Sequence, residues 1–147
     1  VQEAALKSGF SDHLQILCGQ SHTALAACDV TLIASGTATL EAALFKRPMV
    51  IAYHMSWLSW QIMRRKQLQP WVGLPNILCQ KFVVPELLQD EATPAALAQA
   101  TLSWLANDPA SGEKISRLED IFTALHHVLQ RDTSELAAHA IEQVLQG

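Results

Sequence analysis

The residues best suited to chemistry lie in the segment Ser35-Gly36-Thr37-Ala38-Thr39-Leu40-Glu41, directly after an apolar run. A buried strand that turns at once into a helix points the first N–H groups of that helix toward the carboxyl edge of the sheet. Open α/β sheets bind ligands at that edge, and helix N-termini favour phosphate. Gly36 lets a phosphate approach the backbone, Ser35, Thr37 and Thr39 add hydroxyl donors, and Glu41 can accept hydrogen bonds from sugar hydroxyls. The segment therefore predicts a site for a phosphorylated ligand.

A structural interpretation of the same segment stays open. Ser35 and Thr37 could simply cap a helix, with Glu41 as a solvated helix residue. The segment contains neither G-x-G-x-x-G nor G-K-[ST], which disfavours a dinucleotide and excludes a P-loop. The three cysteines form no C-x-x-C pair and the six histidines show no H-x-x-x-H spacing, so we expect no metal and no cofactor. Cysteines in apolar contexts favour small buried thiols in a reducing compartment, the cytoplasm.

A β-α-β-α-β pattern must position these residues. Helices are expected at 20–28 and 37–45, between strands at 14–18, 30–34 and 49–53. The run 30–34 is apolar on both faces, which predicts a central strand. Right-handed βαβ units stacked this way imply an α/β fold: a Rossmann-like parallel sheet with helices on both faces.

The second half of the chain is predicted to be mainly helical. Of 147 residues, 50% are hydrophobic, which suits one compact unit with a core at 1–90 and a helical tail at 91–147. Thr93-Pro94 is an N-cap followed by proline at the first helical position. Asp132 begins a pattern that resembles a capping box. The expected elements are a helix at 57–68, an irregular stretch at 69–76, a brief strand at 77–78, a helical turn at 85–89, and helices at 93–107, 116–130 and 134–146.

Basic residues concentrate between Ala42 and Pro85, where no acidic residue occurs. Within that stretch, residues 55–66 combine two tryptophans with a basic triplet, which suits the interface with anionic lipid. The candidate membrane-contact residues are Trp57, Trp60, Arg64, Arg65 and Lys66. The alternative is an ordinary helix packed on the sheet with its arginines at the rim, because its apolar residues form no single stripe.

The run 27–43, followed by 47–53, resembles the nucleotide-sugar-binding segment of GT-B glycosyltransferases. Three further motifs are similar to those of the lipid-A-disaccharide synthase family. They are Pro48 to Met55, Leu74-Pro75-Asn76-Ile77-Leu78 and Pro85-Glu86-Leu87-Leu88-Gln89. The resemblance covers nearly the whole chain but only the C-terminal half of that enzyme. We therefore expect an internal segment of a longer polypeptide, with a UDP-sugar-binding Rossmann-like core at 1–90.

The resemblance implies transfer of 2,3-diacylglucosamine from UDP-2,3-diacylglucosamine to 2,3-diacylglucosamine 1-phosphate (lipid X), giving lipid A disaccharide 1-phosphate and UDP. It places Ser35, Gly36, Thr37 and Thr39 on the UDP diphosphate and Glu41 on the ribose. Tyr53 and Asn76 would line the same cleft. The general base is expected in the missing N-terminal half, so no catalytic residue is assigned here and the fragment alone is expected to be inactive.

The resemblance also implies the partners of the chain. The helices at 91–147 would contact the N-terminal half of the same enzyme, with a homodimer as one expectation. The enzyme would bind peripherally to the cytoplasmic face of the inner membrane, and no nucleic acid is expected. From the residues alone, a non-enzymatic α/β domain that binds a phosphorylated ligand or mediates oligomerisation remains the alternative.

Overall fold

A parallel three-stranded sheet forms the centre of the computed structural model, which describes residues 7, 9, 11–66, 69–130 and 133–146. Its order is β1 (Thr31–Ala34), β2 (Met49–Tyr53), β3 (Glu86–Leu88). Leu32 lies opposite Val50, and Ala52 lies opposite Leu87. The central strand β2 begins with three fully buried residues, Met49, Val50 and Ile51. The expectation of an α/β fold with a parallel sheet is confirmed.

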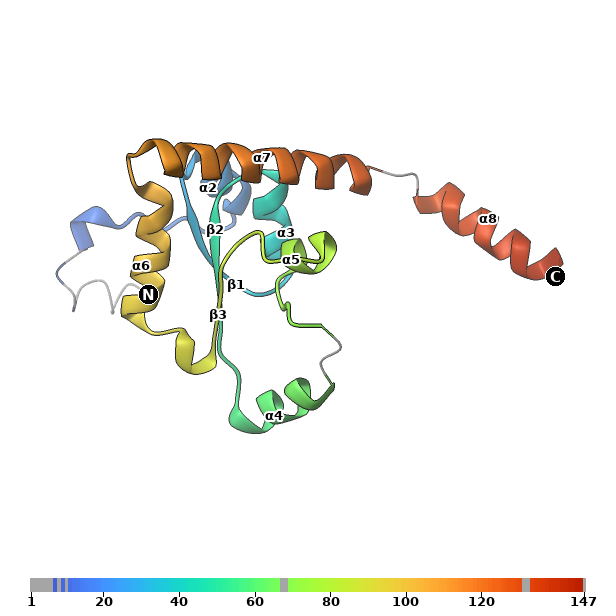
Figure 1. Cartoon of the computed structure of the whole chain (residues 1–147), viewed down its shortest axis with the longest axis horizontal. Helices are drawn as coiled ribbons and strands as arrows, with labels where there is room; N and C mark the ends of the chain where they lie inside the picture. Colours follow the sequence, from blue (N-terminus) through green and yellow to red (C-terminus); the bar gives the residue numbers. More distant parts are fainter. Residues whose placement is uncertain (1–6, 8, 10, 67–68, 131–132, 147) are drawn as a thin grey trace.

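Helices lie on both faces of this sheet, as expected (Figure 1). Helices α3 (Thr37–Leu44) and α5 (Leu74–Cys79) lie on one side, and α6 (Pro94–Leu105) lies on the other. The long helix α7 (Pro109–Leu129) crosses the end of the sheet and contacts both α3 and α6. The buried hydrophobic core joins these elements through Leu25, Ala42, Ala43, Met49, Val50, Ile51, Val84, Trp104, Leu118, Phe122 and Leu125.

Local capping explains where the C-terminal helices begin. The Thr93 hydroxyl accepts a hydrogen bond from the Ala96 N–H at 3.2 Å, confirming the predicted N-cap of α6. Asp108 caps α7 in the same way, accepting from the Ser111 N–H at 2.8 Å, so this helix starts earlier than residue 116. The hydrogen bonds from the Ser111 backbone and hydroxyl hold the pKa of Asp108 below its usual value. Helix α8 (Thr133–Gln146) projects from the body in Figure 1, and the predicted capping residue Asp132 lies outside the described residues.

The prediction of a strand in the N-terminal part of the sheet is wrong. A short 3-10 helix, η1 (Ser11–His13), is followed by exposed residues without strand structure where 14–18 was expected to pair, and Cys18 is exposed. A strand exists only where a neighbouring backbone pairs with it, and in the described residues β1 pairs with β2 alone. Strand β1 is therefore an edge strand, not a central one. Alternate side chains point to opposite faces, so Ile33 packs on the core whereas Leu32 is 54% exposed.

Two further predictions fail between the second and third strands. The expected strand at 77–78 belongs to helix α5, because Pro75 sits in the first helical turn, where its missing N–H has no intrahelical partner to lose. The expected helical turn at 85–89 is instead β3 followed by the 3-10 helix η2 (Gln89–Glu91). Pairing with Ile51 to Tyr53 overrides the helical propensity of Glu-Leu-Leu.

The remaining helices agree with expectation. Helix α2 (Ser21–Ala27) precedes β1, and α4 (Trp57–Lys66) follows β2, while residues 67–68 lie outside the described part. Arg47 donates hydrogen bonds to the carbonyl groups of Leu25 and Ala26 at the end of α2. This arginine of the acid-free stretch therefore holds a helix C-terminus, where a cation is favoured.

Candidate functional site

The turn between β1 and α3 leaves the start of that helix open. Gly36 is its N-cap residue and makes no side-chain cap, and Gly36 and Thr37 are both exposed. The Ser35 hydroxyl donates to the Val72 carbonyl oxygen at 3.4 Å instead of capping the helix. Within the described residues, no side-chain hydrogen bond of Thr37 occurs. Neither Ser35 nor Thr37 therefore caps α3 with its side chain.

Gly36 has a backbone conformation that only glycine adopts easily, with φ +144° and ψ −168°. A Cβ built at this position would meet no atom within 4 Å, so side-chain bulk would not clash with the protein itself. The glycine is therefore required by the path of the chain, and the space above it is open.

The first prediction concerns this glycine. Gly36→Ala is expected to lower the free energy of unfolding by about 1–3 kcal/mol, through backbone strain alone. The matched control is Gly112→Ala in α7, where an added Cβ also meets nothing within 4 Å and φ is not positive. The control should stabilise the helix by up to about 1 kcal/mol. Urea denaturation compares the two variants, and equal effects would mean that Gly36 is not strained.

Thr39 lies behind the turn and not at its surface. It is fully buried, and its hydroxyl donates to the Gly36 carbonyl oxygen at 2.6 Å. The expectation that Thr39 contacts a diphosphate therefore needs correction. Its hydroxyl is already bonded and has no access to a ligand, so Thr39 fixes the turn that presents Gly36.

Glu41 lies farther along α3 and has a partner that the sequence did not reveal. Its carboxylate Oε2 is 3.4 Å from Nε2 of His22, on α2, and its side chain is 42% exposed. The His22 ring also lies 5.7 Å from the ring of Phe45, measured between centroids. Glu41 thus keeps accessible acceptor oxygens beside the exposed ring of His22. Tyr53 is the last residue of β2 and is half-buried.

Asn76 belongs to a buried network instead of the surface of a cleft. It is 0% exposed, and its Nδ2 donates to the Val84 carbonyl oxygen at 2.9 Å and to Glu86 Oε1 at 2.7 Å. Its Oδ1 accepts from the N–H groups of Val83 at 2.8 Å and Val84 at 3.1 Å. All four bonding positions of the amide are therefore used. The expectation that Asn76 lines the cleft is corrected to a positioning role.

Glu86 is the residue of this network that sequence reasoning missed. Its two carboxylate oxygens accept from the N–H groups of Val72 at 2.9 Å and Gly73 at 2.8 Å. The carboxylate therefore fixes the start of α5. A Cβ at Gly73 would lie 2.2 Å from Ile51 Cδ1, so the buried Ile51 side chain would have to shift to admit it. Two sequence signals pointed to Glu86: it belongs to the motif Pro85-Glu86-Leu87-Leu88-Gln89, and it is the first acidic residue after the acid-free stretch.

The candidate site lies at the carboxyl edge of the sheet. β1 and β2 are parallel and in register, so Ser35 and Tyr53 follow or end neighbouring strands on the same edge. The Ser35 hydroxyl ties this edge to the segment before α5. A parallel sheet with an uncapped helix N-terminus at its carboxyl edge defines a Rossmann-like domain of the kind that forms half of a GT-B fold.

Comparison with known proteins assigns the chain to a family. The family model described as lipid-A-disaccharide synthetase matches residues 3–141. The chain is 74% identical over its whole length to the lipid-A-disaccharide synthase of Albidiferax ferrireducens, covering 38% of that protein. It is 64% identical to the enzyme of Verminephrobacter eiseniae, over 99% of the chain and 37% of the relative. The chain belongs to the lipid-A-disaccharide synthase family, and it spans little more than a third of the length of these relatives.

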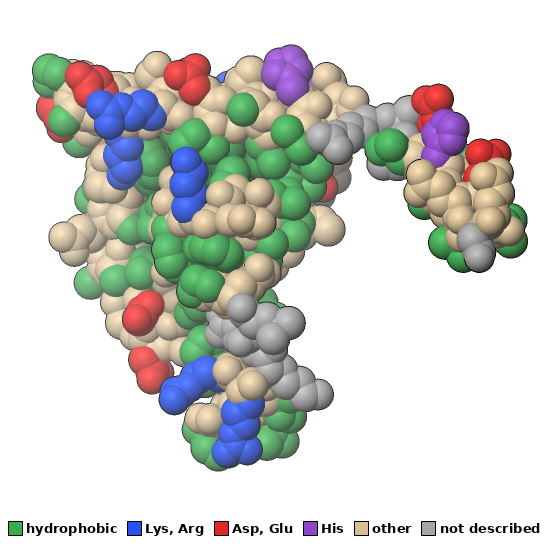
Figure 2. All heavy atoms as spheres, turned by 45° about the vertical axis from the view of Figure 1, so that its right-hand side comes forward, with side chains coloured by type: hydrophobic (Ala, Val, Ile, Leu, Met, Phe, Trp, Pro, Cys, Tyr) green, Lys and Arg blue, Asp and Glu red, His purple; other side chains and the backbone are tan. Residues whose placement is uncertain are grey.

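Helix α4 carries the exposed apolar and basic residues of the acid-free stretch. Trp57 is 73% exposed, and Leu58, Ile62, Arg64 and Arg65 are also exposed. Trp60 is half-buried, and the side chain of Lys66 lies outside the described part. Figure 2 shows basic side chains at the lower end of the molecule, where this helix lies. Among the described residues, no helix is both long and apolar enough to cross a membrane.

Proposed function

We propose that this chain is the donor-binding half of a glycosyltransferase that moves 2,3-diacylglucosamine from UDP to 2,3-diacylglucosamine 1-phosphate. Family membership supports the reaction class. The observation that carries the binding role is the uncapped N-terminus of α3 at the carboxyl edge of the sheet. There, exposed N–H groups and the Gly36 turn would receive the UDP diphosphate.

Transfer requires that the negative charge on the departing UDP be stabilised. The partial positive charge at the start of α3 would supply part of that stabilisation, because the backbone N–H groups are fixed before the reaction begins. Thr37 would add a hydroxyl donor at the same position, and Thr39 would keep the turn rigid from below. We assign no general base to this chain, and we expect it in the longer polypeptide.

Glu41 would bind the ribose hydroxyls, with His22 holding its carboxylate in place. In this proposal, Glu41→Ala in the full-length protein weakens UDP binding about tenfold, or about 1.4 kcal/mol. The carboxylate is partly exposed, so folding should change little. Calorimetric titration with UDP measures the effect.

The matched control for this prediction is Glu119→Ala, which removes an exposed carboxylate from α7. It should leave UDP affinity within twofold of the parent protein. Equal affinities for all three proteins would mean that Glu41 is an ordinary solvated helix residue. Normal UDP binding without any sugar transfer by the full-length protein would support a non-enzymatic binding domain instead.

We further propose peripheral attachment through α4 to the cytoplasmic face of the inner membrane. The acylated substrates of the proposed reaction reside in a membrane, and exposed tryptophan beside arginine suits its interface. Helix α4 directly follows β2, so attachment there would place the lipid surface beside the carboxyl edge. The N-terminal half of the enzyme would complete the site.

A further inference from the structure

A cavity of about 410 Å³ opens at the opposite end of the sheet from the proposed UDP site. Its walls come from α7, the end of α6, and the loop 81–83. That loop lies just before β3 in the chain, and α6 runs back from the carboxyl end of β3 (Figure 1). The residues that line the cavity therefore lie toward the amino edge of the sheet. The volume falls within the range of small-molecule sites. None of the residues proposed to bind UDP lines this cavity.

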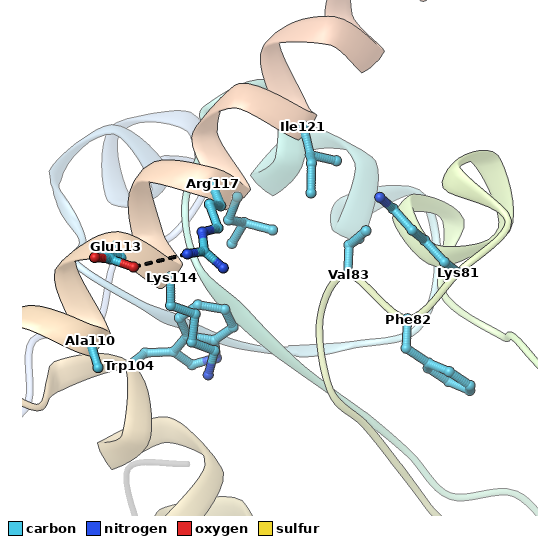
Figure 3. Close-up of a pocket in the computed structure, with 10 residues that line it drawn as sticks. Lys81, Phe82, Val83, Trp104, Ala110, Glu113, Lys114, Arg117 and Ile121 are labelled. Atoms are coloured by element: carbon cyan, nitrogen blue, oxygen red, sulfur yellow. Dashed lines mark hydrogen bonds and ion pairs between the residues drawn. The ribbon is translucent and has the colours of Figure 1, made fainter.

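Three cationic side chains line the opening, from two separate parts of the chain. Lys81 extends from the loop toward α7, whereas Lys114 and Arg117 belong to α7 itself (Figure 3). The one acidic residue in the lining is Glu113, whose Oε2 accepts a hydrogen bond from Nη2 of Arg117 at 2.9 Å. That contact uses one of the five N–H donors of the guanidinium. Within the described residues, neither lysine has a carboxylate partner, so the opening keeps an excess of positive charge.

Lys114 is held in position by an aromatic ring. Its Nζ lies 3.6 Å from the centroid of Trp104, a cation–π contact. Trp104 is 3% exposed, and partial burial lowers the pKa of Lys114 through desolvation of its ammonium group. A cation that has lost part of its hydration interacts more strongly with an anion than a fully solvated one does.

The rest of the lining is apolar. Val83, Leu118 and Ile121 contribute apolar side chains to the lining. Phe82 lies on the loop side of the opening (Figure 3). Phe82 is exposed and its ring contacts Trp71 edge-on, with the ring centroids 6.4 Å apart. An inorganic anion would satisfy the cations but leave this apolar wall in contact with water. A neutral apolar molecule would leave the cations without partners.

From this combination, we infer that the cavity is a second ligand site, which binds a small amphipathic anion. Its phosphate or carboxylate group meets Lys81, Lys114 and Arg117, and its short apolar portion lies against Val83 and Ile121. The site is separate from the nucleotide site in position and in the residues that form it. It therefore does not depend on UDP binding at the α3 turn.

Binding of hexyl phosphate to the full-length protein tests the inference. Inorganic phosphate supplies the charge alone and hexanol the apolar chain alone, so both should bind at least tenfold more weakly than hexyl phosphate. Binding is followed by NMR through the indole N–H signal of Trp104, assigned by its loss in Trp104→Phe. The double variant K81Q/R117Q should weaken hexyl phosphate binding at least tenfold, since both side chains are exposed and their replacement should leave the fold intact.

The matched control is R64Q/R65Q, which removes the same charge from α4. It should leave hexyl phosphate affinity within twofold of the parent protein. If both double variants weakened hexyl phosphate binding equally, the effect would come from the overall charge of the protein, and the inference would be overturned. It would also be overturned if hexanol bound as tightly as hexyl phosphate, or if UDP displaced hexyl phosphate. Displacement by UDP would place the anion at the carboxyl edge.

Discussion

Asn76→Ala is expected to lower the free energy of unfolding by about 3–5 kcal/mol, because it leaves several buried polar groups unpaired. The N–H groups of Val83 and Val84 and the Val84 carbonyl oxygen would each lose a partner. Glu86 would lose the donor at 2.7 Å from its Oε1. Urea denaturation of the full-length protein, followed by tryptophan fluorescence, measures the shift in midpoint.

Asn107→Ala provides the control, because Asn107 is an exposed asparagine between α6 and α7. Its effect should stay within about 0.5 kcal/mol. The folded fraction of Asn76→Ala should bind UDP with nearly the parental affinity, since a buried amide has no ligand contact to lose. A variant with normal stability and weak UDP binding would restore Asn76 to the cleft and contradict the positioning role.

Replacing Arg64, Arg65 and Lys66 with glutamine in the full-length protein is expected to cost about 3 kcal/mol of binding to anionic vesicles. Each basic group near such a surface contributes about 1 kcal/mol, and salt screens the attraction within a Debye length. The triple variant should therefore leave the vesicles at moderate salt, where the parent protein still sediments with them. Binding of UDP in solution should remain unaltered.

A second triple variant controls for net charge. Lys81, Lys114 and Arg117 carry the same total charge at the other end of the molecule, so changing them to glutamine should affect vesicle binding much less. Equal loss from both triple variants would indicate attraction that depends only on overall charge. Equal sedimentation of the α4 variant and the parent at every salt concentration would show that the basic triplet is an ordinary solvated rim.

The sequence predicts the fold well where a local signal and the tertiary structure agree. Strand β2 and the helices α2, α3 and α6 follow from apolar runs, a glycine turn and a Thr-Pro cap, all of which act over a few residues. The edge position of β1 could not be predicted, because an apolar strand does not reveal how many neighbours pair with it. Strand β3 was missed because only its pairing with β2 makes Glu86 to Leu88 extended.

The candidate site could likewise be predicted only where its residues depend on local sequence. The strand, glycine and helix sequence is local, so the placement of Ser35, Gly36 and Thr37 at one turn could be predicted. Whether a hydroxyl or amide faces solvent or core depends on contacts across the fold. Thr39 and Asn76 are polar residues in a plausible motif, yet both side chains are used internally. His22 lies 19 positions before Glu41 in the sequence, and only the packing of α2 beside α3 brings their side chains together.

The network around Glu86 also determines which parts of the molecule can open separately. The backbone N–H groups of Val72 and Gly73 donate to Glu86, and those of Val83 and Val84 donate to Asn76. These hydrogen bonds link the two ends of the segment 72–86 to each other. Amide protons at these four positions should exchange with solvent together, as one cooperative unit of local unfolding. Helix α4 precedes that unit, and none of its described side chains belongs to the buried core. Local unfolding of α4 would therefore not extend beyond Val72. The helix could change its position while the parallel strands keep their register.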